Sequence, residues 1–284
     1  MQVRPIEGAD VNSAIAIMQR GFPDPPNATW PEFFEHVKAK QARELVGPIG
    51  YLLRKDDRDV GIILTFRSQR TQANGTSVDV VNLSGWYIDE AYRWYAPMML
   101  KKILKDKTAI FTDLTASEEV LKMLPAFKFK PWTEGVLMSS LPQSLSRYRR
   151  DVSIVRPEQS STTTISDADM TLLRDHAALG CRTCILSVDG THHPLVFATR
   201  WRRKIPHAYL IYAPDRQVVL SALGNVSAHL AKRGQFLIAM DCNENECVGA
   251  GQFRPTTWQK YYTGPVDAGG IDYAYSELVY MGCA

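Results

Sequence analysis

The chain has 284 residues, of which 45% are hydrophobic, so it is long enough for two domains with apolar cores. Its 33 basic and 30 acidic residues leave a formal net charge of +3, which gives no case for a nucleic acid or a membrane surface as partner. No run approaches the roughly 18 apolar residues of a membrane span, and the charged N-terminus lacks the apolar core of a signal peptide. We therefore expect a cytoplasmic protein, and the composition leaves its oligomeric state open.

Hydrophobic periodicity and turn residues predict a mixed α/β first half. The first elements are a strand near Val3, a helix that Gly21 ends, and a second helix. The predicted helices cover residues 11–21, 30–42, 96–105 and 118–124. The predicted strands cover residues 49–54, 60–66, 78–88, 109–112, 127–132 and 135–139. The resulting order, β-α-α-β-β-β-α-β-α-β-β, is typical of one α/β domain.

The second half partly repeats this pattern after a polar segment with a Ser/Thr run, residues 146–165, which we expect to be a linker. Predicted helices cover residues 169–179 and 218–232, and predicted strands cover residues 183–188, 194–201, 208–212 and 236–240. We therefore expect two similar lobes. The strand-to-helix turn at residues 213–218 has no glycine, so we expect the second lobe to shape a pocket or an interface rather than hold a second cofactor.

The most informative segment covers residues 80–104, where an apolar strand runs through a short polar turn into an amphipathic helix. Unpaired backbone N–H groups at a helix start can hold a pyrophosphate, so this turn suggests a phosphate-bearing cofactor. The turn itself, residues 93–98, contains no glycine that would let a phosphate approach the backbone closely.

This segment resembles the acyl-CoA-dependent N-acetyltransferase superfamily, the GNAT fold. The family pattern at the turn is Arg or Gln, two variable residues, Gly, one variable residue, then Gly or Ala. Arg93 falls on the first position, and Ala96 and Met98 replace the small residues. Ala126-Phe127 falls where the family often has Gly-Phe. The resemblance covers about residues 1–140 and implies a mixed-sheet α/β fold, with a GNAT-like domain over residues 1–145 and a degenerate one over residues 166–284.

The resemblance also implies acetyl-CoA or another acyl-CoA as co-substrate. The backbone N–H groups of the turn would bind the pyrophosphate, and the strand edge would pair with the pantetheine amides. Proline contributes no N–H, although it is at home in a first helical turn. The implied cofactor-binding residues are Tyr87, Ile88, Arg93, Trp94, Tyr95, Ala96, Pro97 and Met98.

For catalysis, the resemblance implies transfer of the acyl group to an amine or hydroxyl of a small-molecule acceptor by direct attack on the thioester. Candidates for the base are Tyr87, Asp89 and Glu90, which could instead be core and helix-capping residues. Lys122 falls where many members carry a tyrosine that protonates the thiolate. Ser84 and Trp86 are candidate substrate-binding residues.

The altered residues Ala96, Pro97, Met98 and Lys122 keep a second hypothesis open. In that hypothesis the chain retains the fold but has lost catalysis, and it serves as a ligand-binding or interaction module.

Two further features lie in the second half. The cysteines at positions 181, 184, 242 and 247 could form a zinc site, or they could be buried free thiols, which we favour; no metal is predicted. The stretch at residues 254–265, with Arg254, Lys260, Tyr261 and Tyr262, could bind an anionic substrate group. It could equally be a loop that buries Trp258 and the tyrosines.

Overall fold

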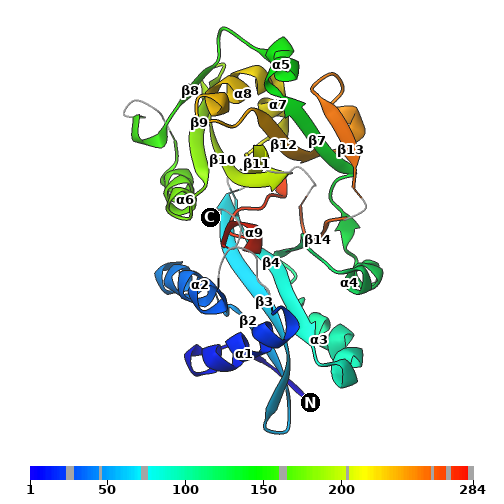
Figure 1. Ribbon diagram of the computed structural model, residues 1–284. Helices are drawn as coiled ribbons and strands as arrows, with labels where there is room; N and C mark the ends of the chain where they lie inside the picture. The colour runs from blue at the N-terminus through cyan, green and yellow to red at the C-terminus, as the bar shows by residue number, and fades with distance from the viewer. Residues whose placement is uncertain are drawn as a thin grey trace. The chain divides into compact units, whose positions relative to one another are not determined.

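The structure is a computed structural model that describes residues 1–23, 29–44, 47–71, 76–159, 165–202, 205–256, 259–266 and 270–280. The chain forms two compact units (Figure 1). The first consists of Met1–Trp132, Trp258–Asp267 and Tyr275–Met281. The second consists of Thr133–Thr257, Ala268–Ala274 and Gly282–Ala284. Each unit is built on one seven-stranded mixed sheet, which confirms the predicted α/β class.

The sheet of the first unit has the strand order β1-β2-β3-β4-β5-β14-β6. Its only parallel pair among the described strands is β4 with β5. The strands are β1 (Gln2–Pro5), β2 (Gly50–Lys55), β3 (Arg58–Thr71), β4 (Ser77–Ile88), β5 (Ile110–Asp113), β6 (Lys130–Pro131) and β14 (Tyr261–Thr263). The helices are η1 (Gly8–Asp10), α1 (Val11–Gly21), α2 (Trp30–Glu44), η2 (Glu90–Tyr95), α3 (Ala96–Ile103), α4 (Glu118–Met123), η3 (Leu124–Phe127) and α9 (Glu277–Tyr280).

Helices cover both faces of this sheet, with α1 and α2 on one side and α3 on the other (Figure 1). Helix α1 buries residues three or four positions apart, such as Ala14, Ile17 and Met18, so one stripe of the helix faces the strands. Helix α3 does the same with Met99 and Ile103. The apolar periodicity that predicts these helices is therefore the pattern that packs them onto the sheet.

The sheet of the second unit has the order β13-β7-β12-β11-β10-β9-β8, again with one parallel pair among the described strands, β11 with β12. The strands are β7 (Gly135–Ser140), β8 (Ser153–Val155), β9 (Arg182–Val188), β10 (Thr191–Arg202), β11 (Ile205–Tyr212), β12 (Leu237–Cys242) and β13 (Gln252–Pro255). The helices are α5 (Leu141–Ser144), η4 (Leu145–Arg147), η5 (Pro157–Gln159), α6 (Asp167–Ala178), α7 (Arg216–Ser221), α8 (Leu223–Ala231) and η6 (Glu244–Glu246).

Each sheet contains a strand from the other half of the chain. Strand β7, which we expected at the end of the first lobe, pairs with β12 and β13 in the second sheet. Strand β14 lies in a stretch for which we predicted no strand and left open a loop or an anion-binding segment, yet it pairs with β5 and β6 in the first sheet. Both strands satisfy backbone groups that would otherwise form an unpaired sheet edge.

The expected linker, residues 146–165, also contributes structure in its described part. Strand β8 pairs with β9 through Ser153↔Ser187 and Val155↔Ile185, so this polar segment forms the outer strand of the second sheet. The expected helix over residues 218–232 is two helices, α7 and α8, separated at Ala222. Strand β8 escaped prediction because its three residues are too few to show a period in the sequence.

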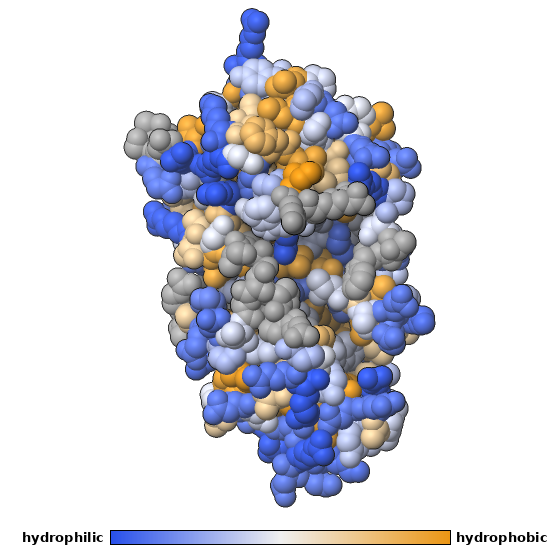
Figure 2. Space-filling view, in the orientation of Figure 1, coloured by the Kyte–Doolittle hydropathy of each residue, from blue (hydrophilic) through white to orange (hydrophobic). Residues whose placement is uncertain are grey.

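The view in Figure 2 shows a mostly hydrophilic surface on which hydrophobic side chains form separate patches. Large exposed hydrophobic side chains include Trp94, Trp201 and Phe236. None of the described helices is long and apolar enough to span a bilayer.

Candidate functional site

The central feature of the first unit is the point at which β4 and β5 stop pairing. Their parallel pairing runs from Val80↔Ile110 to Leu83↔Asp113, where β5 ends. Strand β4 continues to Ile88 and is paired there only with β3. Within the described residues, no strand pairs with the β5 side of residues 84–88, which we call the open β4 edge. Its backbone N–H and C=O groups can therefore bind an extended chain that carries amides.

A local irregularity marks the start of the open β4 edge. The register between β3 and β4 shifts between Ile62 and Leu64, and Gly85 has φ +53°. A Cβ atom at Gly85 would lie 2.8 Å from Cε of Met18, so helix α1 packs directly on this position. The positive φ and the close approach both require glycine here, and the bulge bends the strand where it separates from β5.

Trp86 lies on the same edge and packs against the core that includes α3. Its indole N–H is buried and has no hydrogen-bond partner within the described structure. A buried, unpaired donor is costly, and a bound acceptor would satisfy it.

The turn after β4 differs from the expected phosphate site in its hydrogen bonding. The N–H of Tyr92 donates to the carbonyl of Asp89 at 2.8 Å, and the N–H of Ala96 donates to the carbonyl of Arg93. Helix η2 uses its backbone N–H groups in such i→i+3 bonds, and Pro97 has none to offer. In this conformation the backbone donors of the turn are therefore largely occupied, and the pyrophosphate role of residues 93–98 stays a prediction.

The side chains of the turn are more available than its backbone. Arg93, Pro97 and Met98 are exposed, and Tyr95 and Ala96 are half-buried. Trp94 is 69% exposed and stacks on Tyr95, with ring centroids 3.5 Å apart.

The structure places the predicted catalytic residues in mostly structural surroundings. Tyr87 packs on the end of α1, where a Cβ on Gly21 would lie only 2.5 Å from its Cγ. The carboxylate of Asp89 accepts hydrogen bonds from Arg20 at 3.3 Å and from Arg58 at 3.2 Å. Of the remaining predicted residues, Ile88 is buried in the core, Glu90 is exposed in η2 and Lys122 is exposed in the last turn of α4. Their catalytic roles stay predictions.

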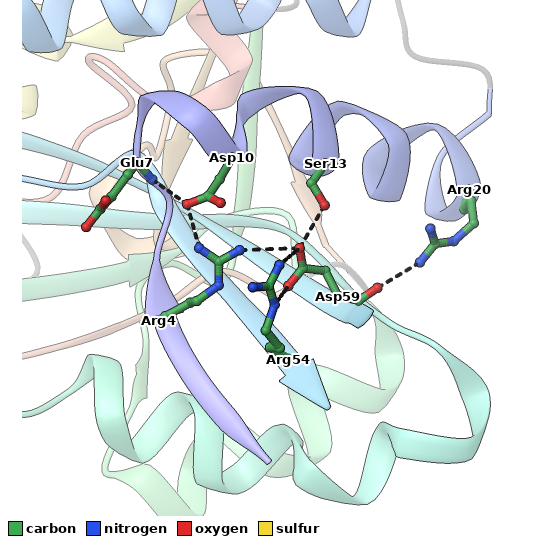
Figure 3. A network of polar contacts seen from close by, with 7 residues as sticks. All are labelled: Arg4, Glu7, Asp10, Ser13, Arg20, Arg54 and Asp59. Carbon is green, nitrogen blue, oxygen red and sulfur yellow. Dashed lines mark hydrogen bonds and ion pairs between the residues drawn. The ribbon is translucent and has the colours of Figure 1, made fainter. Parts of the chain in front are cut away.

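Figure 3 shows a polar network around Asp59 that includes Arg20. Arg20 also donates to the Asp89 carboxylate and so connects Asp89 to this network. The buried Asp59 carboxylate accepts two hydrogen bonds from Arg54, at 2.9 and 3.0 Å, and one from Ser13 at 2.8 Å. Arg4 approaches the same carboxylate at 3.4 Å. Burial opposes ionisation, but these partners together hold the pKa of Asp59 below its usual range. The network ties α1 to the β2–β3 hairpin and, through Arg20, to the end of β4.

A carboxyl group that the sequence analysis missed lies at the end of β5. Asp113 is buried, and burial together with the neighbouring Glu277 carboxylate raises its pKa to about 8, against a hydrogen bond from the Thr115 backbone N–H. The Thr115 hydroxyl donates to Oε1 of Glu277 at 2.6 Å. Asp113 pairs in register with Leu83, the last β4 residue before the open β4 edge. The sequence signal was weak, because Glu277 lies 162 residues after Thr115.

The second unit shows different chemistry at its corresponding turn. Helix α7 begins at Arg216, and the Asp215 carboxylate accepts a hydrogen bond from the Gln217 N–H at 2.7 Å. This carboxylate puts a negative charge at the helix start, where it would repel a phosphate.

The cysteines do not assemble into a metal site in the described structure. Cys181, Cys184, Cys242 and Cys247 are buried and form no disulfide with one another, and burial raises the pKa of Cys184 to about 12. Among the described residues, no group of three or more His, Cys, Asp or Glu side chains is arranged to hold a metal ion.

The aromatic and basic stretch near residue 260 is partly strand rather than loop. Tyr261 and Tyr262 belong to β14, Lys260 is buried, and Arg254 belongs to β13 and donates to Gln252. Trp258, which one of the two alternatives buries, lies outside the described residues.

Comparisons with known proteins agree with this topology. No family model matches the sequence, and no curated protein matches it. Among solved structures, the chain is similar to a GCN5-related N-acetyltransferase from Anabaena variabilis, with 8% identity, a TM-score of 0.57, and coverage of 92% of this chain and 72% of that one. It is also similar to a GCN5-related N-acetyltransferase from Kribbella flavida, with 10% identity, a TM-score of 0.53, and coverage of 92% and 71%.

A third similar structure is a proposed acetyltransferase from Pyrococcus horikoshii. It shares 15% identity and a TM-score of 0.52, and the match covers 99% of this chain and 95% of that chain. At identities this low, the similarity shows a shared architecture and does not show a shared activity. The chain has the fold of the GCN5-related N-acetyltransferases.

Proposed function

We propose that the first unit is an acyl-CoA-dependent acyltransferase that acts on an amine or hydroxyl of a small-molecule acceptor. The observation that carries the proposal is the separation of β4 from β5 beside the buried Asp113. The last β5 residue paired with β4 therefore carries a buried carboxyl group with a raised pKa, next to the start of the unpaired strand edge. The acetyltransferase neighbours support the same class of reaction.

The residues present fit one part of an acyl-CoA better than the other. The open β4 edge suits the two amides of the pantetheine arm, because a strand edge alternates N–H donors and C=O acceptors. The buried indole N–H of Trp86 offers a further donor. The turn offers the diphosphate few free backbone donors, so the exposed Arg93 side chain is the better candidate there. When bound, the co-substrate would supply an acyl group activated as a thioester.

Asp113 is the group best suited to proton transfer. As an amine forms the new C–N bond it must lose a proton, and a carboxylate whose pKa lies near the working pH accepts that proton effectively. The sulfur–carbon bond breaks in the same reaction, and the thiolate leaves with the bonding electron pair and is then protonated. Thr115 holds Asp113 through its backbone N–H and Glu277 through its hydroxyl, so the two carboxyl groups keep a fixed spacing.

The test combines calorimetric titration with acetyl-CoA and longer acyl-CoAs with thioester-cleavage assays over a panel of amines. We expect the wild type to bind at least one acyl-CoA. Asp113→Asn should keep this binding but lower kcat by about 100-fold or more. The control is Asp56→Asn, an exposed carboxylate in the β2–β3 turn. A wild type that binds none of these thioesters would remove the basis of the proposal.

The internal hydrogen bonds of η2 favour a second candidate function. If the turn cannot open, the first unit serves as a ligand-binding or interaction module without transfer. Tight binding of an acyl-CoA with no turnover across primary amines, hydroxylamine and alcohols would identify this case. The two candidates thus differ in turnover and not in affinity.

A further inference from the structure

The second unit repeats the strand separation of the first. Strands β11 and β12 pair in parallel only at Ala208↔Ile238 and Tyr209↔Ala239. Strand β11 then continues to Tyr212 while paired with β10, and β12 continues to Cys242 while paired with β7. Ile211 lies beyond the last β11 residue that pairs with β12, at the register shift between β10 and β11.

A segment of the same unit fills this position. The backbone N–H of Tyr273 donates to the Ile211 carbonyl at 2.9 Å, and the Tyr273 hydroxyl donates to Oδ2 of Asp241 on β12 at 2.7 Å. Tyr273 therefore bridges the two strands where they part. The Tyr209 hydroxyl donates to the same carboxylate oxygen at 2.6 Å, and the two tyrosine rings meet edge to face at 5.8 Å.

The segment around Tyr273 is almost completely buried in the second unit. Tyr273 is 1% exposed and Ile271 is 3% exposed. Burial and the Asp241 carboxylate raise the pKa of both tyrosines well above the usual value, so their hydroxyl groups stay protonated and remain donors. In the first unit, by contrast, no hydrogen bond from the described backbone reaches the β5 side of the open β4 edge.

We propose that residues 271–274 are an internal ligand of the second unit and that they cover a latent binding site for an acyl-pantetheine arm. The choice of ligand rests on the proposed function of the first unit. Tyr273 presents an amide N–H to a strand edge and a hydroxyl to a buried carboxylate. A pantetheine arm carries both kinds of group, two amides and hydroxyls, on an extended chain.

The same geometry excludes the nucleotide part of CoA. Asp215 already caps the start of α7, and its carboxylate would repel phosphates. Helix α7 is also only six residues long. The latent site therefore takes the arm without the nucleotide, and the suitable probe is S-acetyl-pantetheine.

The first experiment counts probe molecules bound at saturation. We expect the wild type to bind one equivalent of S-acetyl-pantetheine, at the first unit, and Tyr273→Ala to bind two. Tyr148→Ala removes an exposed tyrosine of the same unit and should still bind one. A folded Tyr273→Ala variant that binds no more probe than the wild type would overturn the inference. A wild type that binds none, together with a variant that binds one, would instead refute the proposed function and leave the inference standing.

A second measurement covers the case in which Tyr273→Ala does not fold. Hydrogen exchange of the wild type should be slow at residues 271–274, and excess probe should accelerate it several-fold, because the probe captures the conformation in which the segment has left. Exchange in β10 should not change. Unaltered exchange at residues 271–274 at the highest soluble probe concentration would count against a latent site.

Discussion

Asp113→Asn should alter how the stability of the protein depends on pH. In the folded chain, burial and the neighbouring Glu277 raise the pKa of Asp113 from 3.8 to about 8. The folded state therefore holds a proton that the unfolded state has released at any pH between these values. By linkage, the stabilising contribution of this proton is full below pH 3.8 and declines as the pH rises toward 8. Asparagine resembles the protonated carboxyl in shape and has no proton to lose, so the substitution should remove this decline.

The size of the effect follows from one proton. A difference of one bound proton changes the free energy of unfolding by about 1.4 kcal/mol per pH unit. From pH 5 to pH 7, the declining contribution of this proton should lower the free energy of unfolding of the wild type by about 2.5 kcal/mol. This change adds to the background change that all other groups cause. The Asp113→Asn variant should show only the background. Its advantage over the wild type should thus grow with pH across this range.

Urea unfolding at pH 5, 6, 7 and 8, followed by tryptophan fluorescence and circular dichroism, measures this difference. Asp56→Asn is the control, since Asp56 is exposed in the turn between β2 and β3, and its profile should follow the wild type. Profiles of Asp113→Asn and the wild type that stay parallel within about 0.5 kcal/mol from pH 5 to 7 would refute the buried protonated carboxyl.

Three further predictions concern stability. Gly21→Ala should lower the free energy of unfolding by about 1–3 kcal/mol, because the new Cβ would meet the Tyr87 ring. Thermal melts measure this loss. Gly8→Ala is the control and should be neutral, because a Cβ there would have no atom within 4 Å. Asp59→Ala should lower the free energy of unfolding by about 2–3 kcal/mol. This loss is smaller than for a fully buried ion pair, because the Arg54 side chain is 35% exposed. The control is Asp57→Ala, which removes an exposed neighbouring carboxylate and should change the stability little. A fragment of residues 1–145 lacks β14, so it should show no cooperative urea transition, and a sharp one would contradict the strand exchange.

The sequence predicts the helices and strands whose burial follows a simple period. Ala14, Ile17 and Met18 recur at helical spacing and lie on the buried face of α1. The apolar run that ends at Ile88 forms β4, and the structure ends it at the predicted residue. These elements are predictable because local pattern and tertiary burial agree.

The missed elements depend on partners that are distant in the chain. Strand β14 has only three residues, in a polar and aromatic stretch, and it is a strand because β5 and β6 offer it their edges. The expectation for residues 93–98 treated the helix start as a source of free N–H groups. Residues 93–95 instead end the 3-10 helix η2 and residues 96–98 begin α3, so few N–H groups are left for a ligand, and local sequence alone does not reveal this outcome.

The strand separation is a stronger guide to the site than the motif that pointed to it. The motif depends on the residues of one turn, and the structure shows that those residues hydrogen-bond to one another. The separation depends instead on the end of β5 at Asp113, on the bulge at Gly85 and on a sheet in which β14 occupies the other side of β5. Because the second unit has the same separation but fills it with Tyr273, the architecture alone does not make a ligand site. What distinguishes the first unit is an edge to which no described backbone segment hydrogen-bonds, next to a buried carboxyl group whose pKa is raised to about 8.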